Sequence, residues 1–550
     1  MARLDRLSPV KEVAQIGSCI GREFSYDLLA SIATMHQRDL DEALGQLAQS
    51  QLVFQHGTPP QSTYTFKHAL VQDTAYGSLL ISRRQALHKS IAETLKERFP
   101  ERVVNEPEVV AHHYTEAGLN DMATDYWLLA ARRDVERFAN VEAIAHLNRG
   151  LKAWEALPAG MEKDRRELLL QINLGTALGN SKGYTPPEVG RAFSRARELC
   201  ERVGDMPKML SILFGLWVFY VMRADYRASG EIDHQILALA EQVADSGGTV
   251  AGHQTSCATQ LFAGDFQRSI FHGKSGLSAY DEDSHRDLAM IYGLHPGAMS
   301  ADFLAWSLLI VGFPDQSKAK HAFAWQVATA LHEPLTMATI LVHIALLDCL
   351  YQDAHATLTK SRQVIALCKE SGILIRQAEG EILEGWALSE LGDTARGIPQ
   401  LEAGIAVWHQ LGAQIANPVW FSCLARAYAK AGRHADARNA LQKAFDATDN
   451  NGERFMEPDL YRIEGDFFLA FDDDQTHAAT SYRKAIKLAQ ELNAKFWELR
   501  AATALARLWG SQGKREEAFA LLLPVYNWFT EGFATEDLKD AKALLSELQS

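Results

Sequence analysis

The sequence contains few cysteines and no close pair of them. Six are spread over 550 residues, and the nearest two, Cys349 and Cys368, are 19 residues apart. This spacing excludes a CxxC redox pair and a zinc ribbon. Scattered thiols of this kind are typical of small buried side chains in a reducing compartment, so we expect all six to be buried.

Long apolar runs are also missing. The longest, FLAWSLLIVGF at residues 303–313, is far shorter than the ~20 residues that cross a bilayer. Residues 1–17 lack the apolar core of a secretory signal. The sequence therefore predicts a cytoplasmic protein without a membrane partner.

Lysine and arginine are also fewer than aspartate and glutamate, 55 against 69. The formal net charge is −14, which argues against a large nucleic-acid surface and makes nucleic acid an unlikely partner. The 37 glycines and 16 prolines are too few for a collagen-like or linker-dominated chain, and 47% hydrophobic residues are typical of a folded protein. At ~150 residues per domain the chain is too long for one core, which predicts several domains or a repeat array.

Residues 1–100 form a first region, nearly neutral, with 11 Lys and Arg against 10 Asp and Glu. Helical periodicity predicts helices near residues 8–16, 26–34 and 40–51. The period then falls to two at residues 52–54 and 64–66, on either side of a turn cluster, which predicts a β-hairpin. Three helices followed by a hairpin indicate a winged-helix domain.

A winged helix raises the alternative of a transcriptional regulator. The third helix of a DNA reader needs Arg, Lys or Asn on its exposed face. Residues 40–51 offer Asp41, Glu42, Gln46 and Gln49 instead, with no cation to read a base. We therefore predict an adaptor role for residues 1–100 and keep DNA binding as an alternative.

The segment after the hairpin, FKHALVQDTAYGSLLISRRQALH, resembles a known family. It is similar to the region that follows the ATPase core in signal-transduction ATPases with numerous domains. The resemblance is strongest to bacterial proteins that join a class III adenylate/guanylate cyclase domain, an ATPase module and a tetratricopeptide array. Residues 528–533 and 538–545 also resemble segments of this group. The matching positions in the first segment are Phe66, His68, Val71, Ala75, Tyr76, Leu79, Leu80, Arg83, Arg84 and His88.

In that family the cyclase domain and the Walker A loop would precede residue 7. The resemblance thus implies a chain that corresponds to the C-terminal half of such a protein. It also implies that the winged helix packs on an ATPase module. An alternative is a cyclase-related protein whose catalytic domain is missing here or supplied in trans.

Internal repeats dominate the remaining sequence. A small residue that ends the first helix of each predicted pair recurs at intervals of 40 to 48 residues, at Ala224, Gly264, Gly312, Gln352, Gly392, Gly432, Asp472 and Gly513. The pattern predicts a mainly α fold, a tetratricopeptide-like α-solenoid of about eleven helix pairs. We predict a winged-helix domain at 1–100, the array at 101–535 and a capping helix at 536–550.

The first helices of such pairs line the concave face of a solenoid, and their inner positions are the candidate binding residues. Three aromatics followed by three arginines predict a groove for an apolar segment with an acidic end. The alternative is that the aromatics are core residues and the arginines are solvated. The six positions are Phe214, Trp306, Trp386, Arg426, Arg462 and Arg507.

The metalloprotease motif HExxH and the dinucleotide-binding motif GxGxxG are absent from the sequence, and the run at residues 272–275 (HGKS) lacks the earlier glycine of a phosphate loop. The sequence predicts no catalytic residue, no metal and no cofactor. The main hypothesis is a non-catalytic regulatory scaffold that binds a protein, a peptide or a small ligand, with an ATPase/cyclase module as a candidate partner.

Overall fold

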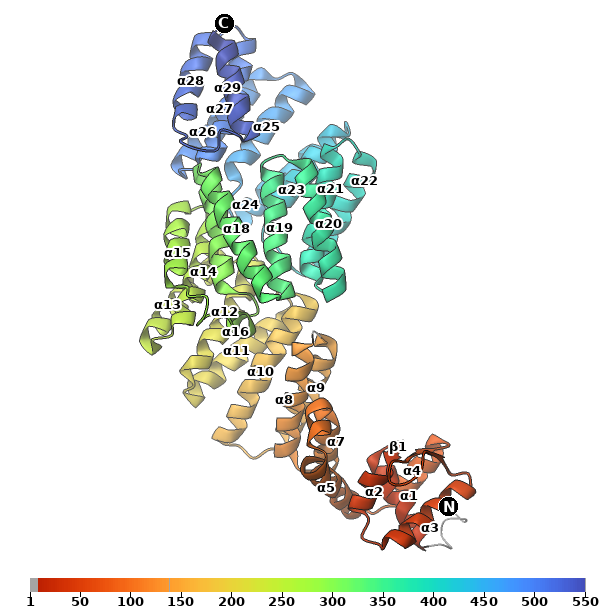
Figure 1. Ribbon diagram of the computed structural model, residues 1–550. Coiled ribbons are helices and arrows are strands. Elements are labelled where there is room, and N and C mark those ends of the chain that lie inside the picture. Colours follow the sequence, from red (N-terminus) through yellow and green to blue (C-terminus); the bar gives the residue numbers. More distant parts are fainter. Residues whose placement is uncertain (1–7, 138, 550) are drawn as a thin grey trace. The chain divides into compact units, whose positions relative to one another are not determined.

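The computed structural model describes residues 8–137 and 139–549, and Figure 1 shows a chain built almost entirely of helices. Within these residues there are 29 helices and three short strands. The chain divides into two compact units, Met1–Ala177 and Leu178–Ser550. In the described ranges no helix is both long and apolar enough to cross a bilayer. Residues 1–7 of the predicted winged-helix domain and Ser550 of the predicted capping helix lie outside them.

The first unit begins with three helices and an antiparallel sheet. Its elements are α1 (Ser8–Ile20), β1 (Glu23–Ser25), α2 (Tyr26–Ile32), α3 (Gln37–Gln49), β2 (Val53–His56) and β3 (Thr63–Phe66). The predicted hairpin is present as β2 and β3, with Val53 opposite Phe66. The sheet order is β1-β3-β2. The sequence did not predict β1, because three residues are too few to show an alternation of polar and apolar side chains. Phe24 of β1 stacks on Tyr64 of β3, with ring centroids 5.8 Å apart.

Seven further helices follow: α4 (Ala69–Gly77), α5 (Ile81–Arg98), α6 (Pro100–Asn105), α7 (Pro107–Glu116), α8 (Asn120–Glu136), α9 (Asn140–Glu155) and α10 (Met161–Lys182), the last of which continues into the second unit. A chain of side chains links α4, α5 and α7. Tyr76 Oη lies 3.1 Å from His88 Nε2, and His88 Nδ1 lies 2.8 Å from His113 Nδ1. Burial lowers the pKa of His88 to about 4, so the imidazole is neutral and can both donate and accept. Tyr76 and His88, two positions of the family resemblance, thus hold three helices together.

The second unit is an array of helix pairs, and the predicted α-solenoid is confirmed. After α11 (Pro187–Val203) come the pairs α12 (Met206–Met222) and α13 (Tyr226–Val243), α14 (Ser246–Ala263) and α15 (Phe266–Ala279), α17 (Pro296–Val311) and α18 (Pro314–Leu331), α19 (Pro334–Leu350) and α20 (Ala354–Ser371), α21 (Leu374–Glu390) and α22 (Thr394–Gln410), α23 (Asn417–Lys430) and α24 (His434–Asn451), α25 (Glu457–Asp472) and α26 (Gln475–Glu491), and α27 (Lys495–Ser511) and α28 (Arg515–Asn527). The short α16 (Leu288–Tyr292) lies between the second and third pairs, and α29 (Glu536–Gln549) ends the array.

The turns of the array lie where the repeat spacing predicted them. Seven of the eight predicted positions have a positive φ, from 57° at Ala224 to 101° at Gly312, and the eighth is shifted by one residue from Asp472 to Asp473. Glycine adopts this left-handed conformation without a steric penalty, which explains its use after most first helices. The six cysteines are buried and free, as expected.

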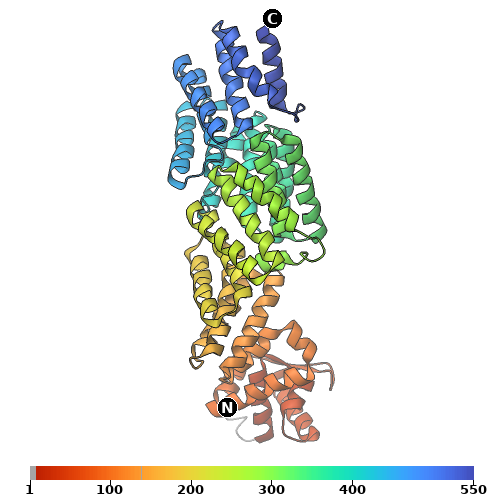
Figure 2. The ribbon, with the colours of Figure 1, turned by 90° about the vertical axis from the view of Figure 1, so that its left-hand side faces the viewer.

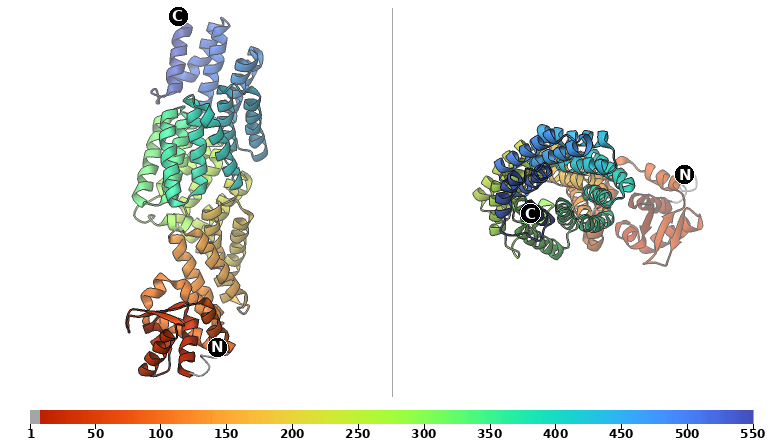
Figure 3. Two further views of the ribbon diagram at one scale, coloured as in Figure 1. Left: turned by 90° about the vertical axis from the view of Figure 1, so that its right-hand side faces the viewer. Right: turned by 90° about the horizontal axis from the view of Figure 1, so that it is seen from above.

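First helices contact one another along the array, for example α21 with α23, α23 with α25, and α25 with α27, and α27 also contacts the last helix, α29. The array also curves far enough for a later arc (residues 411–540) to lie against an earlier arc (residues 185–352), as Figures 2 and 3 show for the second unit. The amide of Gln414 donates to the carbonyl of Met222 at 2.8 Å, and the amide of Arg454 donates to Phe262 at 2.9 Å. Each of these two hydrogen bonds joins segments of the array that lie far apart in the sequence.

Candidate functional site

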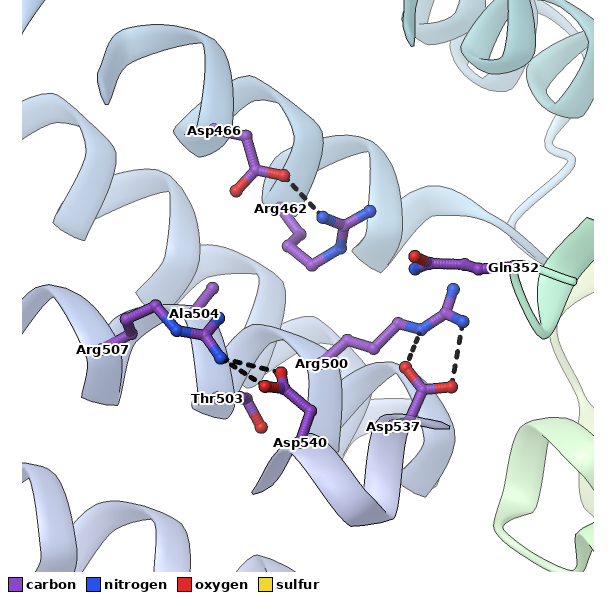
Figure 4. A pocket seen from close by; sticks show the side chains of 9 residues that line it. All are labelled: Gln352, Arg462, Asp466, Arg500, Thr503, Ala504, Arg507, Asp537 and Asp540. Carbon is purple, nitrogen blue, oxygen red and sulfur yellow. Dashed lines mark hydrogen bonds and ion pairs between the residues drawn. The ribbon is translucent and has the colours of Figure 1, made fainter. Parts of the chain in front are cut away.

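A polar cavity of about 230 Å³ lies where the later arc meets the earlier one. Figure 4 shows its lining, in which Ala504 is the one apolar residue and three arginines face three aspartates. First helices α25 and α27, the last helix α29 and the turn after α19 supply the side chains. The lining residues are Gln352, Arg462, Asp466, Arg500, Thr503, Ala504, Arg507, Asp537 and Asp540.

Helical spacing brings these residues together. Arg500, Thr503, Ala504 and Arg507 are at positions i, i+3, i+4 and i+7 of α27, which form one stripe along a helix. Arg462 and Asp466 are four residues apart on α25 and share a face in the same way. The stripe of α27 therefore forms the floor of the pocket between its two neighbours along the array.

Arg462 is held by two carboxylates of its own helix, and its side chain is only 12% exposed. Its Nε donates to Asp459 Oδ1 at 2.5 Å, and its Nη1 donates to Asp466 Oδ2 at 2.6 Å. Burial alone would lower the pKa of Arg462, but the two carboxylates outweigh it and raise that pKa. Burial would likewise raise the pKa of Asp459, yet Arg462 holds it below its ordinary value. The group is a fixed, fully charged ion cluster.

Arg500 is a clamp between helices and between arcs. Its Nε and Nη2 donate to the two carboxylate oxygens of Asp537 at 2.6 and 3.0 Å. Nη2 also donates to the carbonyl of Leu350, at the end of α19 in the earlier arc. The guanidinium packs on the ring of Phe496, 4.4 Å from its centroid. With side chains only 5% and 12% exposed, Arg500 and Asp537 have little freedom to move.

Arg507 is bound much more loosely. A single nitrogen, Nη2, donates to both oxygens of Asp540, at 2.6 and 2.8 Å. The side chains of Arg507 and Asp540 are 55% and 53% exposed. Arg507 thus presents the most accessible guanidinium of the pocket.

The six residues predicted from the repeat register take three kinds of position. Arg462 and Arg507 line the pocket together. Arg426 lies one helix pair earlier and forms an ion pair with Glu390 of α21 at 3.2 Å.

Phe214, Trp306 and Trp386 do not line the pocket. Their exposed fractions are 2%, 2% and 0%, so they lie in the core of the array. Phe214 packs on Trp217 and Tyr292, and Trp306 packs on Phe455 of the later arc. These three aromatic rings are packed in the core, so they are not accessible to a ligand on the surface of the array.

Seven residues of the lining were not predicted from the sequence as site residues: Gln352, Asp466, Arg500, Thr503, Ala504, Asp537 and Asp540. Arg500 could have been found, because it lies seven residues before Arg507 on the same helix face. Gln352 was identified as a turn residue only, since nothing in its repeat indicates that a later arc would approach it. Among the residues that the structure describes, no group of three or more His, Cys, Asp or Glu side chains is placed to hold a metal ion.

The chain matches no described protein-family profile. It is 22% identical over 515 residues to an uncharacterized protein of Rhizobium meliloti (strain 1021), which covers 92% of this chain. The chain spans about half of that relative, 48% of its length.

Solved structures of helical-repeat proteins are similar at low identity. A Rap protein complexed with the competence and sporulation factor has a TM-score of 0.48 and 11% identity, over 68% of this chain and 99% of that one. A signal-transduction ATPase with a tetratricopeptide repeat sensor from Pyrococcus horikoshii has a TM-score of 0.29 and 11% identity, over 98% of this chain and 64% of that one. At these TM-scores neither comparison bears on function.

Proposed function

We propose that this protein is a non-catalytic regulatory scaffold whose helical array binds an acidic segment of a protein or peptide partner. The observation that carries the proposal is the pocket of Arg462, Arg500 and Arg507 on consecutive first helices. Guanidinium groups held in place by neighbouring carboxylates are pre-oriented for a further carboxylate, since each has more N–H donors than its partner uses.

The position of the pocket supports a regulatory role. Arg500 reaches the carbonyl of Leu350, and Gln352 of the same turn lines the cavity. A ligand in the pocket would touch both arcs and favour the packing in which they meet. Binding would then shift the array between two packings of its helix pairs.

The sequence supports a more specific proposal for the partner. Residues 1–100 are proposed to be a winged-helix adaptor, residues 101–535 the array and residues 536–550 a cap. By the family resemblance, the partner is an ATPase or cyclase module supplied in trans. Protein rather than DNA is favoured because the exposed side of α3 includes Asp41 and Glu42, while its one cation, Arg38, lies 3.8 Å from Glu42.

Arg507→Ala tests the pocket with a fluorescein-labelled hexaglutamate peptide, measured by anisotropy at about 50 mM salt, where screening is weak. We expect the substitution to weaken binding about tenfold, as the loss of a charge-assisted hydrogen bond would. The wild-type Kd should rise with salt.

Arg433→Ala is the matched control, because it removes the same charge from an exposed pair with Asp436 at the start of α24. It should leave binding within twofold of wild type. Equal losses in both variants would show that the peptide responds to overall charge and not to the pocket.

A further inference from the structure

The two aspartates of α29 hold their arginines in different ways. Asp537 binds Arg500 through two nitrogens in a nearly buried pair, whereas Asp540 binds Arg507 through one nitrogen in a half-exposed pair. Both pairs join the same two helices, three residues apart on α29 and seven apart on α27. The difference therefore lies in the local contacts and not in the helices that carry them.

Arg507 retains unused binding capacity. Within the described chain, its Nε and Nη1 have no hydrogen-bond partner, and Asp540 contacts only Nη2. The favoured contact of a carboxylate with a guanidinium uses two nitrogens side by side. Asp540 thus neutralises the charge of Arg507 without forming the two-nitrogen contact. That contact remains open to an incoming carboxylate.

Asp540 can leave its arginine without disturbing the cap. The packing of α29 depends on Leu538, Ala541, Leu544, Leu545 and Leu548, which are buried against α27 and α28. Asp540 is not a member of that apolar core, and its side chain is 53% exposed to water. Exposed ion pairs of this kind are weak and exchange readily.

We propose that Asp540 is an internal stand-in for the ligand, a carboxylate that the acidic partner displaces from Arg507. The pocket is then self-occupied in the free protein, and the partner segment competes with α29 for one guanidinium. Asp537 stays on Arg500 and keeps the pocket in shape. This inference rests on the proposed function, and it identifies the ligand group as a carboxylate on a flexible acidic segment.

The test compares Asp540→Asn with wild type, using the same labelled hexaglutamate peptide. Asparagine keeps the size of the side chain and removes the competing charge, so the peptide should bind about two- to fivefold more tightly. Asp436→Asn is the matched control: it makes the same change of net charge beside Arg433, far along the sequence from α29, and should leave the Kd unchanged.

A third variant assigns the gain to Arg507. In the double variant Arg507→Ala with Asp540→Asn, the effect of the asparagine should disappear, because no guanidinium is left to release. The inference fails if wild type binds through Arg507 but Asp540→Asn has no effect, or if Asp436→Asn tightens binding equally. If the wild-type protein does not bind the peptide at all, the proposed function fails and this inference fails with it.

Discussion

Glu453 is a carboxylic acid buried at the joint between the two arcs. Tyr226 Oη donates to its Oε2 at 2.8 Å, and the amide of Ala416 donates to the same oxygen at 3.1 Å. Burial raises the pKa of Glu453 to about 8, although both hydrogen bonds act to lower it. At neutral pH the group is therefore mostly protonated in the folded protein and ionised in the unfolded chain.

This difference predicts how stability depends on pH. Between the ordinary Glu value and about pH 8 the folded state binds one more proton than the unfolded state, so stability falls as the pH rises. The contribution is at most about 1.4 kcal/mol per pH unit. Glu453→Gln, which keeps the shape of the neutral acid, should flatten the fall in urea denaturation from pH 5 to 8 relative to wild type. Parallel curves for the two proteins would contradict the assignment.

At this scale the sequence predicted part of the site. The repeat register identified Arg462 and Arg507 because a fixed position in a first helix faces the same side in every pair. The register could not separate aromatic residues in the core from aromatic residues in a groove, since both recur with the helical period. Nor could it predict Glu453, whose burial depends on Tyr226, 227 residues earlier.

Among the elements, helices α21 and α22 show how glycine sets the distance between the two helices of a pair. A Cβ atom built on Gly397 would lie 2.5 Å from the carbonyl oxygen of Gly385 and 2.2 Å from Ser389 Oγ. One contact is with backbone, which cannot move aside. The two glycines thus determine how closely this pair approaches.

We expect Gly397→Ala to destabilise the protein by about 3 kcal/mol, as overpacking of a close contact does. Gly230→Ala is the control, because its nearest neighbour would be Thr259 Cγ2 at 4.0 Å and a helical alanine should stabilise by about 0.5–1 kcal/mol. Urea denaturation of both variants gives the comparison. A neutral Gly397→Ala would show that α21 and α22 can separate freely.

The elements were the most predictable level of the molecule. Helix pairs and their turns followed from spacing, because each pair must bury the same faces and end in the same kind of turn. The strand β1 and the five-residue α16 were not predicted, since neither is long enough to show a period. β1 exists because β3 offers a free edge to it, which is a tertiary and not a local cause.

On the scale of the second unit, the arcs are joined by hydrogen bonds between residues 150 to 227 positions apart. At one joint Glu531 accepts the amides of Asp315 and Gln316 at 2.9 and 3.0 Å, which caps the start of α18 from a distant segment. Gly532 returns the contact, with its amide donating to Asp315 at 3.0 Å. The repeat pattern has a period of about 40 residues and contains no signal at these longer separations. The sequence therefore could not predict which helix pairs of the two arcs meet.

Glu531→Ala tests this joint. We expect a loss of about 1 kcal/mol, typical of a missing cap, and faster amide hydrogen exchange both at the start of α18 and near residue 532. Asp353→Ala removes a cap within a single pair, where the carboxylate accepts the amide of Ala356 at 2.9 Å. Exchange should then rise only at the start of α20. The same local pattern in Glu531→Ala would mean that the joint does not couple the two segments.

The contact between arcs also has a mechanical consequence. A solenoid with open coils extends like a soft spring, because only small rotations between neighbouring pairs are needed. Here the two arcs touch. Before the second unit can lengthen, the hydrogen bonds of Tyr226 to Glu453 and of Asp315 to Glu531 must break. Under a pulling force the second unit should therefore resist extension at first. Its stiffness should then fall in steps as the hydrogen bonds between the arcs break one after another.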